Sequence, residues 1–344
     1  MTLRVPPVAL RRVANPLWLP GAVLLTVPLL LGLVVGGLAA LTPGQRRLLR
    51  LSALALTYVW VDVSILVACW WLWLCSPLPR RDLDTWRQRH ATVLGWALRC
   101  LLARSESTVG FHLELENPAA TQDRGRPLVV LARHAGPGDS FALVHLLLEQ
   151  LGRRPKVVLK EVLQLDPGLD VLLNRLDCYF LPSRSGAGED RTEAVRRLAQ
   201  SLTAREALLI FPEGGNWTPR RHRRAVRRLF RRGESRRARR AAEHPAVLPP
   251  RPGGAVACLT ARDDTDVVVV AHAGLDTLVN PGQMWRAIPV HDRPMRVSWW
   301  VTDADRVPRT QEAAQVWVEN MWARVDTWVR HARAVATAPA APTA

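Results

Sequence analysis

The chain has 344 residues, enough for one large domain or two ordinary ones, and its 48% hydrophobic content is globular rather than disordered. Lysine and arginine outnumber aspartate and glutamate by 47 to 30, so we expect the protein to be attracted to something anionic. The five scattered cysteines form no C-x-x-C pair, which excludes a disulfide framework and a cysteine zinc site and favours a reducing compartment.

Two long apolar segments begin the chain. Residues 17–41 contain no charged side chain, and residues 51–75 contain only Asp62. A helix of about 20 apolar residues crosses the hydrocarbon core of a bilayer, and the short segment between the two forces an antiparallel return. Tryptophans near the outer ends fit an aromatic interface belt. We therefore predict a membrane hairpin, with helices at about 17–41 and 51–75, inside an anchor of residues 1–79.

Two other interpretations of these segments remain open. The first segment is a candidate for a cleaved signal peptide, although it exceeds the usual 7–15 residue apolar core of such signals. Alternatively, both segments are buried core helices. Gly32 and Gly36 form a G-x-x-x-G pattern that lets helices approach closely. We expect Asp62 to face the partner helix or a perturbed part of the bilayer. Seven arginines flank the outer ends against three in the turn, which favours a large domain on the cytoplasmic side of the cell membrane.

Beyond the hairpin, short β-branched runs alternate with helical stretches. We predict a linking helix at 83–102, and then strands in the sequences PLVVLA, KVVLK, EALLIF, DVVVVAH and MRVSWWV. This alternation predicts an α/β domain over residues 80–334, with a mixed, mainly parallel sheet flanked by helices. A closing amphipathic helix would use Trp317, Met321, Val325 and Trp328 for core packing, and the tail 335–344 is expected to be disordered.

The turn RHAGPGDS follows the first of these strands. Gly136 and Gly138 permit backbone angles closed to other residues, so the Asp139 carboxylate can reach one imidazole nitrogen of His134. The other nitrogen would then accept a proton from a hydroxyl group. Alternatively, Asp139 only caps the next helix and His134 packs at a strand end. Ser140 lacks a G-x-S-x-G context for a nucleophile, so the attacking hydroxyl would belong to the substrate.

An arginine-rich stretch follows a second turn, FPEGGNWTP. Twelve of the 22 residues from 219 to 240 are arginine, against one acid, Glu234. Thr218 suits an N-cap, Pro219 suits the first helical position and Gly233 suits the helix end. We predict a basic amphipathic helix that lies on an anionic membrane surface through Arg220–Arg240, with a solvated charged helix as the alternative.

Four blocks of this sequence, taken in order, resemble the glycerolipid acyltransferase family, which includes 1-acylglycerol-3-phosphate and lysophospholipid acyltransferases. His134 to Asp139 resembles the H-x-x-x-x-D block, YFLPSRSG resembles a strand leading to an acceptor-binding arginine, FPEGGNWT resembles F-P-E-G-T, and AVLPPRPGG resembles an apolar strand ending in proline. The third block departs from the family pattern, because Gly215, Asn216 and Trp217 stand where a hydroxyl residue and a basic or polar one usually follow E-G.

The resemblance implies a division of roles among the residues. His134 and Asp139 would be the catalytic pair, and backbone N–H groups of Gly136 and Gly138 would stabilise the oxyanion. The residues implied in acceptor binding come from all the other blocks and their flanks: Lys160, Arg184, Glu213, Gly214, Gly215, Thr218, Arg220, Arg221, Pro250 and Arg251.

The implied reaction moves a fatty acyl chain from acyl-CoA or acyl carrier protein to the free hydroxyl of a lysophospholipid, for which we expect 1-acylglycerol-3-phosphate. The implied reaction needs no metal and no bound cofactor. The other histidines lack metal-ligand spacing and are interpreted as structural: His112, His145, His272, His291 and His331. The expected partners are membrane lipids, the acceptor and the thioester donor. Two alternatives stay open: a membrane-tethered binder of anionic lipid or nucleic acid without catalysis, with nucleic acid disfavoured, or a glycolipid acceptor.

Overall fold

The structure is a computed structural model that describes residues 5–41, 46–76, 82–117, 125–136, 138–181, 191–278 and 280–337. The chain folds into two compact units, each assembled from separate stretches of sequence. The first unit comprises residues 1–111, 144–188 and 285–291, and the second comprises residues 112–143, 189–284 and 292–344. Helices α5 (Asp139–Glu149) and α11 (Pro281–Ala287) contain residues of both units.

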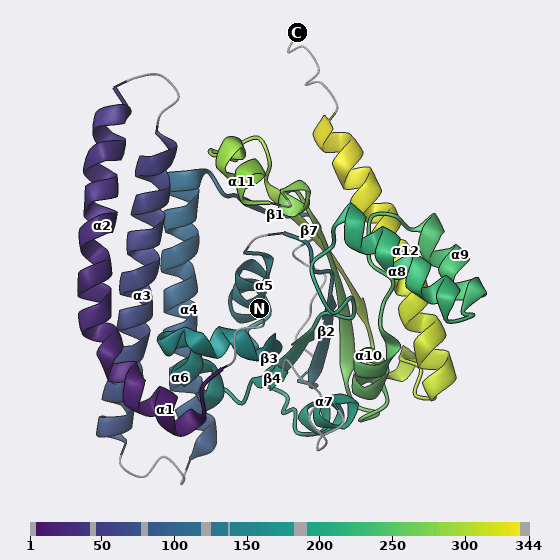
Figure 1. The fold of residues 1–344 in the computed structure, drawn as a ribbon. Coiled ribbons are helices and arrows are strands. Elements are labelled where there is room, and N and C mark those ends of the chain that lie inside the picture. The colour runs from purple at the N-terminus through teal and green to yellow at the C-terminus, as the bar shows by residue number, and fades with distance from the viewer. Residues whose placement is uncertain are drawn as a thin grey trace. The chain divides into compact units, whose positions relative to one another are not determined.

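The first unit is mainly helical (Figure 1). Its strands β3 (Arg154–Lys160) and β4 (Tyr179–Leu181) pair in parallel. Its helices are α1 (Val8–Ala14), α2 (Trp18–Ala39), α3 (Arg47–Cys75), α4 (Leu83–Val109) and α6 (Pro167–Arg175), with short 3₁₀ turns η1 (Asn15–Leu17) and η3 (Glu161–Leu165). The linking helix is longer than the predicted 83–102, because it continues to Gly110, whose φ of 77° ends it.

Helices α2 and α3 form the predicted antiparallel hairpin. Both are long and apolar enough to cross a membrane by length and composition. They approach closely at the glycines of the G-x-x-x-G pattern: a Cβ atom added to Gly36 would lie 2.5 Å from the backbone nitrogen of Leu49. Large apolar side chains of α2 such as Leu24 (74% exposed) and Val27 (64% exposed) face outward, so α2 is not a buried core helix.

Helix α3 is also joined to α6 by polar contacts. Asp62 is buried and its Oδ2 accepts a hydrogen bond from the backbone nitrogen of Gly168 at 3.3 Å. The Tyr58 hydroxyl donates to Asp166, and Arg11 forms an ion pair with Asp170 at 3.0 Å. Asp62 therefore faces the start of α6, because the free N–H groups at a helix start attract a carboxylate, and it also lies beside Trp18 of the partner helix α2.

The second unit contributes five strands, in the order β1-β7-β6-β2-β5. Its strands are β1 (Leu113–Leu115), β2 (Leu128–Ala132), β5 (Glu206–Ile210), β6 (Asp266–Ala273) and β7 (Met295–Thr302). All neighbours pair in parallel except β6 and β7, which are antiparallel, so the predicted mixed, mainly parallel sheet is confirmed. β2, β5 and β6 are buried along their whole length, as expected of parallel strands covered on both faces.

Helices of the second unit cover this sheet. They are α7 (Arg191–Gln200), α8 (Pro219–Arg231), α9 (Ser235–Glu243), α10 (Pro252–Leu259) and α12 (Gln311–Thr337), with 3₁₀ turns η4 (Leu275–Thr277) and η5 (Ala304–Arg306). Helix α10 packs against α7 and α12, and α12 packs along β6. The buried stripe of α12 consists of Ala314, Val318, Trp322, Val325, Val329 and Ala332.

Four details differ from the sequence predictions. The core stripe of α12 includes Val325 but not Trp317, Met321 and Trp328, which are only half-buried. The AVLPP segment is not a strand but an irregular buried segment ahead of α10, since its prolines lack the N–H that a ladder needs. The three-residue strand β1 was not predicted. Helix α12 continues to Thr337, and the rest of the predicted tail lies outside the described residues.

Candidate active site

His134 and Asp139 meet at the carboxyl end of β2. His134 follows the strand by two residues, and Asp139 is the first residue of α5. Gly136 (φ 130°) and Gly138 (φ 77°) adopt backbone conformations that favour glycine, which lets the chain fold back between them. His134 Nδ1 lies 2.8 Å from Asp139 Oδ2. The turn thus brings the two side chains together in the way the sequence suggested.

The Asp139 carboxylate is buried and accepts several hydrogen bonds. Its Oδ2 accepts from the backbone nitrogen of Ala135 at 2.8 Å, and its Oδ1 accepts from that of Ser140 at 2.6 Å. Burial raises the pKa of Asp139, but the His134 hydrogen bond and the nearby His272 outweigh it, so the pKa is below its usual value. Asp139 therefore holds both the His134 ring and the backbone of the turn, so it does more than cap the next helix.

This arrangement fixes the imidazole tautomer. An ionised Asp139 only accepts hydrogen bonds, so His134 Nδ1 donates to it and Nε2 keeps its lone pair. Nε2 has no hydrogen-bond partner within the described part of the chain, and the His134 side chain is 16% exposed. An oriented, accessible imidazole nitrogen beside a buried carboxylate can act as a general base.

The turn FPEGGNW lies alongside the His134 turn. The Phe211 and His134 rings have centroids 4.4 Å apart, and the Trp217 backbone nitrogen donates to the His134 carbonyl at 2.7 Å. Gly214, with φ 66°, occupies the left-handed conformation that lets this turn reverse tightly. The first and third family-like blocks are thus adjacent, although 70 to 80 residues separate them in sequence.

Glu213 is buried inside this turn, with only 2% of its surface exposed. Its Oε1 accepts from the Trp322 indole nitrogen at 3.2 Å, and its Oε2 has no partner within the described ranges. Burial raises the pKa of Glu213 to about 8, although Arg133 opposes the shift. The Glu213 carboxylate therefore has no surface to offer an acceptor, and it supports the turn from inside.

Arg251 lies against Gly214 on the outer side of the turn. Its backbone nitrogen donates to the Pro212 carbonyl at 2.8 Å, and a Cβ atom added to Gly214 would lie 3.0 Å from the Arg251 guanidinium carbon. Burial and the positive charges of Arg228, Arg191 and Arg232 lower the pKa of Arg251. Several arginines crowd this side of the turn, and their mutual repulsion would be relieved by a bound anion.

The remaining third-block residues have clear local roles. Thr218 is the N-cap of α8, as predicted, and its Oγ1 accepts from the Arg221 backbone nitrogen at 3.1 Å. The Arg221 guanidinium donates to the Asn216 carbonyl at 3.0 Å and lies beside Gly215. Arg220 is exposed and its guanidinium has no partner among the described residues. The Pro250 carbonyl accepts from Arg237 at 3.2 Å.

Two predicted acceptor-binding residues are not placed with this group. Lys160 ends β3 in the first unit and is exposed. Arg184 lies outside the described residues. The described residues contain no group of three or more histidine, cysteine, aspartate or glutamate side chains that could hold a metal ion.

The sequence analysis missed a buried ionic group behind the turn. Arg133 has no exposed surface and forms an ion pair with Asp276 at 2.9 Å, which Arg333 also binds, at 2.7 Å. His272 was interpreted as structural, yet its Nε2 lies 3.6 Å from Asp139 Oδ2 and 2.9 Å from the Arg133 carbonyl. The sequence did contain one indication of this group: Arg133 directly follows five apolar strand residues, and an arginine buried there needs an acidic partner.

Comparison with known proteins agrees with this geometry. The fold is similar to the crystal structure of the 1-acyl-sn-glycerophosphate (LPA) acyltransferase PlsC from Thermotoga maritima, with a TM-score of 0.52 and 14% identity over 80% of this chain and 95% of that chain. Residues 112–252 match the family described as Acyltransferase. No curated protein matches the sequence.

The fold is thus a PlsC-type α/β fold with two apolar N-terminal helices. Residues 112–252, which include the His134 turn and the Glu213 turn, thus match an acyltransferase domain.

The buried Glu213 predicts a specific pH dependence of stability. Its pKa is about 8 in the folded protein, against an ordinary value of 4.5. Between these values the folded protein holds a proton that the unfolded chain has lost, so the stability falls as the pH rises. Glu213→Gln should remove this loss, on the order of 1 kcal/mol per pH unit.

The measurement is the free energy of unfolding in detergent at pH 5 and pH 7.5. The gap between wild type and Glu213→Gln should widen at the higher pH in favour of the variant. The exposed Glu312→Gln controls for the change in net charge. An equal pH dependence in wild type and Glu213→Gln would show that Glu213 is ionised in the fold.

Proposed function

We propose that the protein transfers a fatty acyl chain from a thioester, acyl-CoA or acyl carrier protein, to the free hydroxyl of 1-acylglycerol-3-phosphate, and so takes part in phospholipid biosynthesis or remodelling. The single observation that supports this most is the 2.8 Å contact between His134 Nδ1 and Asp139 Oδ2, with Nε2 left accessible. The Thermotoga maritima protein with a similar fold is a 1-acyl-sn-glycerophosphate acyltransferase, which supports the same acceptor.

In the proposed mechanism, His134 Nε2 takes the proton of the acceptor hydroxyl as that oxygen attacks the thioester carbonyl carbon. Asp139 stabilises the imidazolium that forms. The tetrahedral intermediate then collapses, the carbon–sulfur bond breaks, and the thiolate takes the proton from His134 Nε2. The products are the new ester and the free thiol, and the enzyme returns to its starting state without a bound cofactor.

The glycine turn is the proposed oxyanion site. The backbone N–H groups of Gly136 and Gly138 have no hydrogen-bond partner elsewhere in the described ranges. Free N–H groups near the reacting carbonyl oxygen stabilise the negative charge that develops in the intermediate. A Cβ atom added to Gly138 would meet nothing within 4 Å, whereas one added to Gly136 would lie 3.3 Å from the backbone of Leu275.

The arginines beside Gly214 are the proposed site for the acceptor phosphate. Arg251 is held at the turn by its own backbone, and Arg228, Arg191 and Arg232 raise the local positive charge. A phosphate monoester carries close to two negative charges and accepts several charge-assisted hydrogen bonds from arginine. Arg221 is a further candidate, whereas the buried Glu213 is proposed only to hold the turn.

We propose that residues 1–79 anchor the protein in the membrane, with the second unit on the cytoplasmic side. The outward-facing apolar side chains of α2 support the anchor, because they would be poorly solvated in water. The lipid acceptor then reaches the enzyme from the bilayer.

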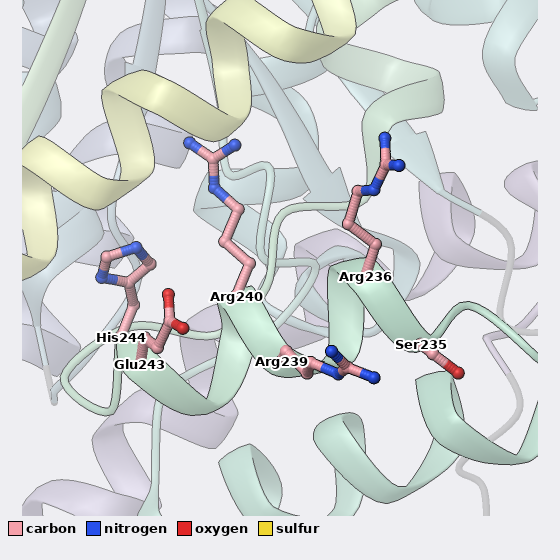
Figure 2. A pocket seen from close by; sticks show the side chains of 6 residues that line it. All are labelled: Ser235, Arg236, Arg239, Arg240, Glu243 and His244. Atoms are coloured by element: carbon pink, nitrogen blue, oxygen red, sulfur yellow. The ribbon is translucent and has the colours of Figure 1, made fainter.

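The proposed contact with the anionic membrane surface is the arginine surface, defined as the exposed arginines of α8 and α9. On α8, the side chains of Arg220, Arg223, Arg224, Arg227, Arg228 and Arg231 have no ion-pair or hydrogen-bond partner among the described residues. A cavity of about 660 Å³ beside α9 is lined by three arginines, one acid and two other polar residues: Ser235, Arg236, Arg239, Arg240, Glu243 and His244 (Figure 2). Arg240 reaches toward α12, where it donates to Asn320 at 2.5 Å, whereas Arg236 and Arg239 have no partner in the described part of the chain.

The apolar face of α8 is partly used within the protein. Leu229 packs against Ala238 and Ala241 of α9, with Val226 beside them. Phe230 is 48% exposed and remains available to a lipid surface. The arginine surface is therefore proposed to bind lipid headgroups mainly by charge, with little insertion of apolar side chains.

The catalytic assignment predicts that His134→Ala abolishes acyl transfer. Loss of a general base lowers such rates by roughly 10² to 10⁴-fold, and the substrate's hydroxyl has no other base nearby in the proposal. The measurement is thiol release from acyl-CoA in the presence of 1-acylglycerol-3-phosphate. The exposed His331→Ala is the matched control and should keep wild-type activity. Full activity of His134→Ala would contradict the assignment of His134 as the general base.

The headgroup proposal predicts that Arg251→Gln raises the KM for 1-acylglycerol-3-phosphate by roughly 10-fold or more, since a charge-assisted hydrogen bond contributes about 1.5–3 kcal/mol. The KM for a monoacylglycerol, which lacks the phosphate, should change little. Exposed Arg306→Gln serves as the control. Equal effects on both acceptors would rule out phosphate recognition by Arg251.

A panel of glycolipid acceptors, read by mass spectrometry of the products, tests the alternative acceptor class.

The membrane proposal predicts that anionic lipid protects the arginine surface. In nanodiscs, trypsin should cleave within residues 219–240 several-fold more slowly when phosphatidylglycerol is present than in pure phosphatidylcholine. High salt should remove the difference, because it screens exposed charges. The triple variant Arg223→Gln, Arg227→Gln, Arg231→Gln should reduce it, and the exposed triple Arg197→Gln, Arg205→Gln, Arg306→Gln should not. Protection by duplex DNA but not by lipid would favour the nucleic-acid alternative.

A further inference from the structure

Trp217 occupies the position in the third block at which the sequence departs from the family pattern. Only 8% of its surface is exposed, and it packs with Ala135 and Leu248. Its backbone nitrogen donates to the His134 carbonyl at 2.7 Å, and its indole nitrogen donates to the Pro245 carbonyl at 3.0 Å. Trp217 therefore links the backbone of His134 to Pro245, which directly precedes the AVLPP segment.

Two guanidinium groups lie over the Trp217 ring. The guanidinium carbon of Arg133 is 5.7 Å from the ring centroid, and that of Arg333 is 4.3 Å from it. Arginine over a tryptophan face is an attractive cation–π arrangement, and burial strengthens it. Arg133 is the residue before His134, whereas Arg333 comes from the last turns of α12.

One carboxylate pairs with both arginines. Asp276 Oδ2 lies 2.9 Å from Arg133 Nη2 and accepts from Arg333 Nε at 3.1 Å and from Arg333 Nη2 at 2.7 Å. Burial raises the pKa of Asp276, but the two arginines outweigh it and lower the pKa below its usual value. Arg133 also donates to the carbonyls of His272 and Ala246 at 2.7 and 2.8 Å. The ring is thus held by a network that is almost wholly buried.

We propose that Trp217, Arg133, Asp276 and Arg333 form a clamp that positions the His134 base, and that Arg333 thereby makes α12 part of the active-site framework. These are positioning residues, because they act on His134 through its backbone and do not touch the reacting atoms. Asp139 sets the imidazole orientation through Nδ1, and the clamp sets where the backbone of His134 sits. Small displacements of a catalytic group cost large factors in rate, so loosening the clamp lowers kcat and leaves substrate binding intact.

The inference rests on the proposed acyl transfer and is tested in the same assay with the full-length enzyme in nanodiscs. Arg333→Met removes both the charge and the contact with the ring, and is expected to lower kcat about 10-fold or more with KM within about twofold. Arg333→Lys keeps the charge beside Asp276 and should recover part of the loss. The matched control is Arg324→Met on the same helix, which removes a similar contact, 4.5 Å from the Trp300 ring, away from the clamp.

The possible outcomes distinguish failure of the proposed acyl transfer from failure of the clamp alone. If the wild-type enzyme releases no thiol with any acceptor, the proposed function fails. If wild type is active and Arg333→Met has the same kcat as Arg324→Met, only the clamp is overturned. A rise in KM with unchanged kcat also overturns it, because that is the effect of a binding residue. Should Arg333→Met not fold, Trp217→Phe, which keeps the backbone N–H but loses the indole N–H, gives the same test: unchanged kcat contradicts the clamp.

Discussion

The hydrogen bond between Asp139 and His134 Nδ1 depends on a backbone that doubles back within five residues. Gly136 and Gly138 supply the positive φ angles for that turn, and the start of α5 supplies the buried carboxylate. Because the same carboxylate also accepts from Ala135 and Ser140, the orientation of His134 is set by the fold of the turn and not by one contact. The parallel strands of the second unit fix the point at which this turn begins.

Behind the turn lies a group of buried ionisable side chains, which a protein interior tolerates only when they are paired or neutral. Arg133 and Arg333 share Asp276, while Glu213 sits without exposure against Trp322. Removing one member would leave an uncompensated charge, so the group acts as a rigid support and not as a source of net stability. The family-like third block here contributes an aromatic ring to that support, at Trp217, where the resemblance led us to expect a polar residue.

The parts of this account that the sequence predicted are those governed by local pattern. The apolar runs predicted the hairpin and the buried strands, and the H-x-x-x-x-D turn predicted the His134–Asp139 contact. The sequence did not predict the contacts between residues far apart in the chain. Nothing local indicates that Arg333 meets Trp217, or that Asp62 accepts a hydrogen bond from the first turn of α6, because such pairings depend on tertiary packing. The AVLPP segment failed as a strand prediction because its apolar character did not outweigh its prolines.

The central claim is that a lipid hydroxyl, activated by His134, receives the acyl chain. The most direct measurement is the stoichiometry of a single reaction, with thiol release and lipid product counted together for the wild-type enzyme in nanodiscs. The account predicts one thiol released for each molecule of phosphatidic acid formed from 1-acylglycerol-3-phosphate, and almost no thiol released without an acceptor. Thiol release at the same rate with and without acceptor would show thioester hydrolysis, and would contradict the claim.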